Sequence, residues 1–108
     1  MNPNDRISNF KIYIAQTPDD PFPRYGLAME YLSMGQIEKA QIVFDELVER
    51  FPDYVATYLM AGSNLAELGR TDEALVMFER GVRMSTRKGD MHTKNELQAA
   101  LDNLRASL

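Results

Sequence analysis

The sequence predicts an all-α fold in which helical hairpins stack on one another. Apolar residues recur at helical spacing along nearly the whole chain, and no segment alternates apolar and polar residues as a half-buried strand does. Glycines and prolines divide the chain into segments of helix length. In addition, the segment GQIEKAQIVF at positions 35–44 returns as GRTDEALVMF at positions 69–78.

The first predicted helix covers residues 4–16. The segment TPDDPFP, residues 17–23, interrupts it, because three prolines in so short a stretch cannot lie within one helix. A second helix then starts near Pro21, with Asp20 as its N-cap, since proline is tolerated in the first turn. We expect this helix to end at Gly35, a residue that readily takes a left-handed conformation.

The third predicted helix runs over residues 37–50 and ends before Pro52, because proline disfavours a helical residue in front of it. The fourth spans residues 55–68 and ends at Gly69. Both helices therefore stop at residues that are typical of helix ends.

Thr71 is the predicted N-cap of a fifth helix, which reaches Met84 or a little further. The last helix begins at Asp90 or at Thr93. The second choice is offered because Thr93 and Glu96 have the spacing of a capping box.

The composition restricts the class of partner. A length of 108 residues indicates one domain, and a net charge of −4 argues against nucleic acid or an anionic membrane as the main partner. The N-terminus lacks the pattern of a secretory signal, and no apolar stretch is long enough to span a bilayer. Together with the absence of cysteine, these features predict a cytoplasmic location.

Nothing in the sequence indicates catalysis. His92 is the only histidine, and without cysteine it has no partner at the spacing of metal ligands. No glycine-rich phosphate loop follows a predicted strand, and no nucleophile, base and oxyanion donor can be assembled. We therefore expect no enzyme activity, cofactor or metal.

A helix–turn–helix unit that recurs every ~34 residues resembles the tetratricopeptide repeat. The first unit occupies residues 21–54 and the second residues 55–88. The residues that carry the resemblance are Leu27, Ala28, Tyr31, Ala40, Phe44 and Pro52 in the first unit, and Ala61, Gly62, Leu65, Ala74 and Phe78 in the second.

This resemblance implies a right-handed helical-hairpin solenoid of about two and a half units, forming a single domain over residues 1–108. Residues 4–18 resemble the second half of an earlier unit, and residues 89–108 resemble the family's closing helix. The sequence departs from the family where Arg24 and Tyr58 replace its usual tryptophan.

In proteins that resemble this one, the first helix of each unit lines a concave groove that holds a peptide or helix of a partner. The family's carboxylate-binding chemistry is not expected, because lysine and asparagine are missing at the matching positions. Carrying the groove over to this sequence gives a mainly apolar set: Phe22, Tyr25, Met29, Leu32, Leu59, Met60, Ser63, Leu97 and Leu101.

Three interpretations of this set stay open. The groove accepts a partner's peptide or amphipathic helix. Alternatively, the same surface or the end helices pair two copies of the chain as a homodimer. In the third interpretation, an end helix covers the set or its residues pack internally.

Arg80, Arg83, Arg87 and Lys88 form the only basic cluster, at spacings that place them on one side of a helix. One interpretation is favourable charge at a helix C-terminus on a solvated face. The other is a docking site for an acidic partner.

Overall fold

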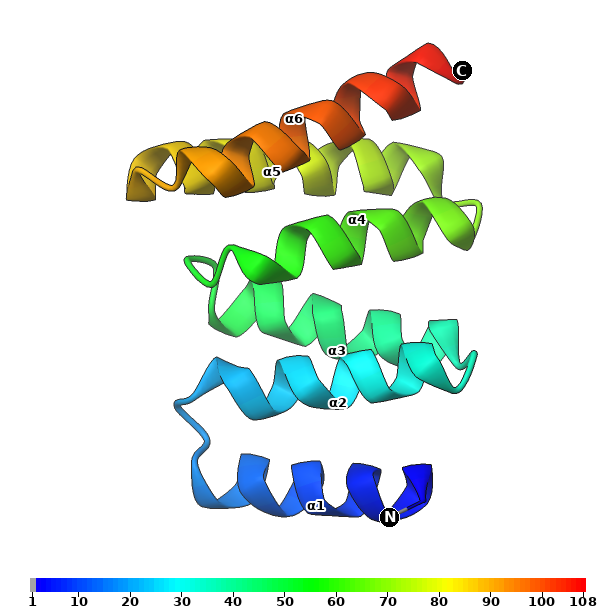
Figure 1. Cartoon of the computed structure of the whole chain (residues 1–108), viewed down its shortest axis with the longest axis vertical. Helices are drawn as coiled ribbons and strands as arrows, with labels where there is room; N and C mark the ends of the chain where they lie inside the picture. Colours follow the sequence, from blue (N-terminus) through cyan, green and yellow to red (C-terminus); the bar gives the residue numbers. More distant parts are fainter. Residues whose placement is uncertain (1) are drawn as a thin grey trace. The chain divides into compact units, whose positions relative to one another are not determined.

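A computed structural model describes residues 2–108, and all regular structure in this part of the chain is helical, as predicted. The chain divides between Phe51 and Pro52 into two compact units, an N-terminal and a C-terminal one. Figure 1 shows the six helices: α1 (Pro3–Gln16), α2 (Pro21–Ser33), α3 (Ile37–Arg50), α4 (Ala56–Glu67), α5 (Thr71–Lys88) and α6 (Met91–Ala106).

Several helix ends lie at the residues that the sequence predicts. The Asp20 carboxylate accepts a hydrogen bond from the Phe22 backbone N–H at 3.0 Å and so caps α2. Gly35, Gly69 and Gly89 follow α2, α4 and α5 with φ angles of 74°, 77° and 72°. Left-handed glycines therefore end all three helices.

The predicted cap of α5 is wrong. Thr71 already belongs to the helix, because the Ala74 backbone N–H donates to the carbonyl of Arg70 at 3.0 Å. Arg70 therefore occupies the cap position, and its side chain makes no capping hydrogen bond. Gln36 holds the matching place before α3, where its carbonyl accepts from the Ala40 N–H at 3.1 Å.

Asp90 caps α6, so the first of the two predicted starts is confirmed and the alternative, a capping box of Thr93 and Glu96, is wrong. The Asp90 carboxylate accepts from the Thr93 backbone N–H at 3.1 Å and from the Thr93 hydroxyl at 2.7 Å. The Thr93 side chain is thus a donor to the cap, and α6 starts at Met91.

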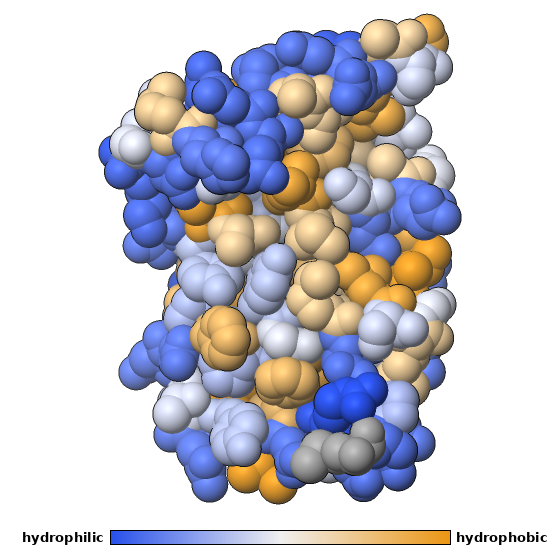
Figure 2. Space-filling model, viewed as in Figure 1, coloured by the Kyte–Doolittle hydropathy of each residue, from blue (hydrophilic) through white to orange (hydrophobic). Residues whose placement is uncertain are grey.

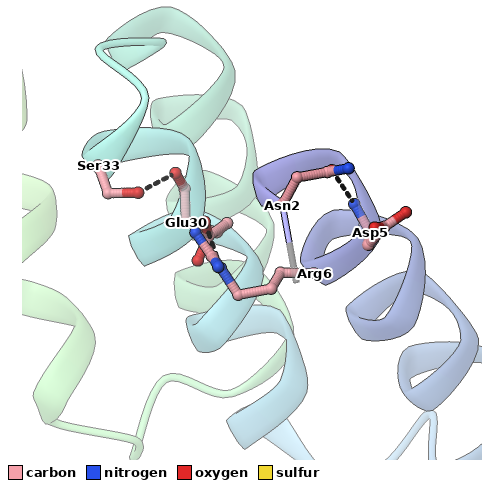
Figure 3. A network of polar contacts seen from close by, with 5 residues as sticks. All are labelled: Asn2, Asp5, Arg6, Glu30 and Ser33. Atoms are coloured by element: carbon pink, nitrogen blue, oxygen red, sulfur yellow. Dashed lines mark hydrogen bonds and ion pairs between the residues drawn. The ribbon is translucent and has the colours of Figure 1, made fainter.

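In the N-terminal unit, α2 packs against both α1 and α3. The ring of Phe10 in α1 lies directly on Gly26, at a place where any Cβ atom would collide with it. Arg6 of α1 also reaches Glu30 of α2, with 2.8 Å between Nε and Oε1 (Figure 3). A close apolar contact and an ion pair thus join α1 to α2.

Arg24 is buried in the N-terminal unit, although it is charged. Its Nη1 group donates to the carbonyl of Pro18 at 2.8 Å, and its Nε group donates to the Glu46 carboxylate at 3.0 Å. The guanidinium also lies over the ring of Phe51, 5.6 Å from the centroid. These three partners compensate for the burial of the charge.

In the C-terminal unit, α5 packs against α4 and α6, and α6 also contacts α4. The ring of Phe78 in α5 lies on Gly62 of α4, so closely that a side chain at Gly62 would collide with it. A Cβ atom on Gly81 would lie 2.6 Å from Tyr58 Cβ and 2.8 Å from a Leu97 methyl carbon. Glycine in these two helices therefore permits close packing of α4, α5 and α6.

Candidate functional site

The predicted contact residues of the first unit lie along α2. Phe22 is 64% exposed, whereas Tyr25, Met29 and Leu32 are half-buried. Their spacing of three and four residues places them on one side of the helix. Tyr25 also supports this surface from beneath, since its ring centroid lies 6.4 Å from that of Phe44 in α3.

The predicted contact residues of the second unit lie on α4. Leu59 and Met60 are half-buried, and Ser63 is exposed. On the face shown in Figure 2, hydrophobic and weakly polar residues lie over α2 and over α4, whereas strongly hydrophilic residues crowd α6. Each of the two repeats therefore presents apolar area on its first helix, α2 or α4.

Leu97 and Leu101 do not belong to an open surface, which corrects their place in the predicted set. Both are buried, at 0% and 3% exposure. Leu97 packs against Gly81, because glycine lets α6 approach α5 closely. Their helical spacing was read correctly from the sequence, but spacing alone does not tell an apolar stripe in a core from one at a surface.

The residues that carry the repeat form the core of each unit, with one exception. Pro52 is exposed and lies in the turn before α4. The buried members are Leu27, Ala28, Tyr31, Ala40, Phe44, Ala61, Gly62, Leu65, Ala74 and Phe78.

Sequence reasoning missed the exposed apolar residues of α1. Ile12 and Tyr13 are 52% and 53% exposed, and α1 has no buried residue. The alignment of the repeats offered a signal, because Tyr13 matches Leu47 and Gly81, which are both buried. The helix face that α3 and α5 bury is therefore open in α1.

In residues 2–108, carboxylate and imidazole groups come close enough to compare as metal ligands only in pairs. No group of three His, Asp or Glu side chains in this range could hold a metal ion. His92 is exposed and lies 3.0 Å from the Glu96 carboxylate on the next turn of α6. Over the same range, no helix is both long and apolar enough to cross a membrane.

The helical hairpins and the regular interval between them define an all-α protein of the helical-repeat class. The tetratricopeptide repeat model matches residues 24–54 and 55–87, more than half of the chain. The chain therefore belongs to the tetratricopeptide repeat family, and the predicted family and fold class are confirmed.

Two curated relatives differ greatly in length from one another. The TPR repeat-containing protein PA0015 of Pseudomonas aeruginosa is 26% identical over 98 residues, which cover 91% of this chain and 93% of that protein. The protein CTR9 homolog of Arabidopsis thaliana is 25% identical over 100 residues. These cover 82% of this chain, but the match spans only 9% of the length of that relative.

Solved structures share the fold. A tetratricopeptide repeat domain protein from Salinibacter ruber is 38% identical, with a TM-score of 0.79 and coverage of 82% of this chain and 90% of that one. PcrH, solved in complex with the chaperone-binding region of PopD, has a TM-score of 0.86 at 17% identity. That match covers 97% of this chain and 80% of PcrH.

Proposed function

We propose that the chain is a non-catalytic protein-interaction module, which binds a peptide or helix of a partner through the apolar surfaces of α2 and α4. The observation that carries this proposal is the exposure of Phe22, a residue at the start of α2 that is 64% exposed. Large exposed aromatic residues beside further apolar area are typical of interaction sites.

The chemistry of α2 supports an apolar ligand segment. The side chains on the proposed contact side of α2 are apolar or aromatic, and none of them carries a charge. They are Phe22, Tyr25, Met29 and Leu32. An amphipathic helix binds such a surface through apolar side chains that are three or four residues apart in its sequence. The PcrH structure, described as a complex with a region of PopD, supports the choice, because the same fold there accommodates a segment of a partner.

Paired variants test this proposal. Phe22→Glu places a charge on the proposed surface of α2, and Ile42→Glu is its control, since Ile42 of α3 is also exposed, at 69%. Leu59→Glu tests α4 in the same way, with exposed Val76 of α5 as the matched control position.

The assay captures partners from cell extract on the immobilised wild-type chain, and then measures the affinity of each captured protein for all variants. We expect Phe22→Glu to weaken binding by about 30-fold, the loss of one central contact of about 2 kcal/mol. Ile42→Glu should leave the affinity unchanged. Retention of every captured protein by both Phe22→Glu and Leu59→Glu contradicts the proposal.

A homodimer is the second candidate, favoured by the open face of α1. Tyr13 is 53% exposed at a position whose counterparts are buried in α3 and α5. A self-complementary apolar patch can pair two copies about a two-fold axis. Light scattering over a range of concentrations tests this: a dimer that dissociates on Tyr13→Glu supports pairing through α1, and a monomer at all concentrations rejects it.

A further inference from the structure

The second half of α5 has a charge balance unlike that of the rest of the chain. Residues 80–88 hold four of the twelve basic residues, Arg80, Arg83, Arg87 and Lys88, and none of the sixteen acidic ones. The whole chain, by contrast, is acidic, with a net charge of −4. A local field of the opposite sign therefore exists on this one helix.

Three of these arginines line one pocket of the C-terminal unit. The pocket has a volume of about 280 Å³ and is bordered by Pro52, Tyr58, Arg80, Arg83, Met84 and Arg87. Arg83, Met84 and Arg87 follow Arg80 by three, four and seven residues, so the four side chains leave α5 on the same side.

Tyr58 fixes one wall of this pocket. Its hydroxyl donates to the carbonyl of Pro52 at 2.5 Å, and the guanidinium of Arg80 lies 6.0 Å from the centroid of its ring. Both partners hold the aromatic ring in place. Since Tyr58 is itself fully buried, at 0% exposure, it supports the pocket from beneath.

The carboxylates of the C-terminal unit that form ion pairs use other cations. Glu73 pairs with Arg70, Glu79 pairs with Arg105, and Glu96 lies beside His92. Within the unit, neither Arg83 nor Arg87 forms an ion pair, and Arg87 makes only a weak polar contact with the sulfur of Met84, at 3.7 Å.

The fold itself does not require this positive charge. Glu46 in α3 holds the position in the first repeat that Arg80 holds in the second, and it pairs with Arg24 and with Arg50. Glu49 similarly matches Arg83. The same repeat positions are thus acidic in one unit and basic in the other.

The helix dipole does not explain the cluster either. Its stabilising effect on cations is confined to the last turn of a helix, and α5 ends at Lys88. Arg87 and Lys88 lie in that turn, and Lys88 also donates to the carbonyl of Asp53 at 3.0 Å. Arg80 and Arg83 lie in earlier turns, where the dipole contributes little.

We propose that this pocket binds an acidic segment of a partner protein through the carboxylates of at least two side chains. Guanidinium groups bind carboxylates in a bidentate manner, with hydrogen bonds that are stronger than neutral ones. Arg80 and Arg87 are separated by two turns of helix, about 10 Å along its axis. A single small anion cannot bridge that distance, whereas successive acidic side chains of a peptide can.

The pocket is lined by none of the residues that form the proposed apolar surfaces of α2 and α4. Met84, which is half-buried, provides apolar contact for the methylene groups of a glutamate. The basic pocket therefore adds a second, electrostatic contact, whose strength falls as salt concentration rises.

Nuclear magnetic resonance titration of the full chain tests the proposal, with a capped hexaglutamate peptide as the probe and a capped hexaglutamine peptide as its neutral control. We expect hexaglutamate to cause saturable chemical-shift changes in the amide signals of residues 80–88 and in the arginine Nε–H signals. Hexaglutamine should cause none. Absence of saturable shifts up to millimolar peptide, or equal shifts with hexaglutamine, overturns the proposal.

Charge variants locate the binding. Arg83 and Arg87 are exposed, so the double variant Arg83→Gln with Arg87→Gln removes two charges from the pocket without removing a buried side chain. We expect it to weaken hexaglutamate binding by about ten-fold. Arg105→Gln, an exposed arginine of α6 in the same unit, is the matched control and should not change the affinity. An equal loss in both variants overturns the assignment of the pocket.

Inorganic phosphate at equal ionic strength distinguishes a protein segment from a phosphate group. We expect phosphate to cause only small chemical-shift changes, and we expect hexaglutamate to displace the bound phosphate. Tighter binding of phosphate than of hexaglutamate at the same signals overturns the choice of a carboxylate ligand.

Discussion

Arg24 and Tyr58 occupy equivalent positions in successive repeats and make the same hydrogen bond with different chemistry. The Arg24 guanidinium donates to the carbonyl of Pro18 at 2.8 Å, and the Tyr58 hydroxyl donates to the carbonyl of Pro52 at 2.5 Å. Pro18 and Pro52 are themselves equivalent in the repeat. In each unit, a side chain from the first turns of a helix therefore ties that helix to the proline turn before it.

Replacement of Arg24 by methionine should destabilise the protein by about 2 kcal/mol. The variant keeps an unbranched apolar side chain but loses the donors to Pro18 and Glu46, and hydrogen bonds to charged groups contribute about 1.5–3 kcal/mol each. Since the Glu46 side chain is 48% exposed, solvent screening reduces the contribution of that ion pair. Urea denaturation followed by circular dichroism measures the loss.

Arg50→Met is the control for this variant. Arg50 also approaches Glu46, at 3.7 Å, but the two side chains are 44% and 48% exposed, so its removal should cost at most about 0.5 kcal/mol. If Arg24→Met and Arg50→Met lower the free energy of unfolding by the same amount, the buried contacts of Arg24 do not stabilise the protein.

Tyr58→Phe should lower the free energy of unfolding by about 1 kcal/mol, the contribution of one hydrogen bond. Burial raises the pKa of Tyr58 above its ordinary value of 10.0, while the neighbouring Arg80 partly opposes this rise. Because the folded state holds the proton more tightly, the stability that Tyr58 contributes is complete below pH 10. It is lost as the pH rises through the pKa of the folded state.

Urea midpoints of wild type and Tyr58→Phe at pH 8 and at pH values above 10 measure this dependence. The two proteins share the other tyrosines, so only their difference reports Tyr58. We expect this difference to shrink with rising pH. A difference that grows above pH 10 means that the ionised form is the one the fold favours.

The repeat predicted the helices and core, because both follow from local spacing. Asp20 and Gly35 were predicted correctly, since a cap and a left-handed exit depend only on neighbouring residues. The start of the last helix stayed open between Asp90 and Thr93, because two candidate caps lie three residues apart in the sequence. The structure selects Asp90, whose carboxylate accepts both hydrogen bonds.

The candidate site was predictable only in part. Leu97 has the same helical spacing as a surface stripe, and its burial depends on Gly81 in another helix. Likewise, Gly26 carries no local signal, because its importance comes from the ring of Phe10. Contacts between residues distant in sequence decide these cases, and the pattern of a single helix does not contain them.

Asp90→Ala should destabilise α6, and the effect should depend on pH. Hydrogen bonds from the Thr93 side chain and backbone lower the pKa of Asp90 below its ordinary value of 3.8. The stability that the carboxylate contributes is therefore present above pH 3.8 and is lost as the pH falls through the lower pKa of the folded state.

Thermal denaturation at pH 7 and at pH 3 provides the measurement. Wild type should exceed Asp90→Ala in melting temperature at pH 7, and the gap should narrow at pH 3. Asp90→Asn is the control, because asparagine also caps helices but does not titrate. A gap between wild type and Asp90→Ala that stays constant between these pH values contradicts a role for the ionised carboxylate.

Gly62→Ala should destabilise the protein by about 1–2 kcal/mol, although alanine is the better helix former. In an exposed helix this change would stabilise by up to about 1 kcal/mol. Here the new methyl group would collide with the ring of Phe78, and overpacking of a core costs about 1–3 kcal/mol. The neighbouring Ser63→Ala, at an exposed position of the same helix, should be neutral or slightly stabilising.

A double-mutant cycle separates this collision from other effects. Phe78→Leu alone leaves a cavity and should destabilise, but combined with Gly62→Ala the smaller side chain makes room for the methyl group. The two changes should therefore couple by about 1 kcal/mol in the favourable direction, measured by urea denaturation of all four proteins. Strict additivity would mean that the Phe78 ring does not restrict residue 62, and the close packing of α4 against α5 would need another explanation.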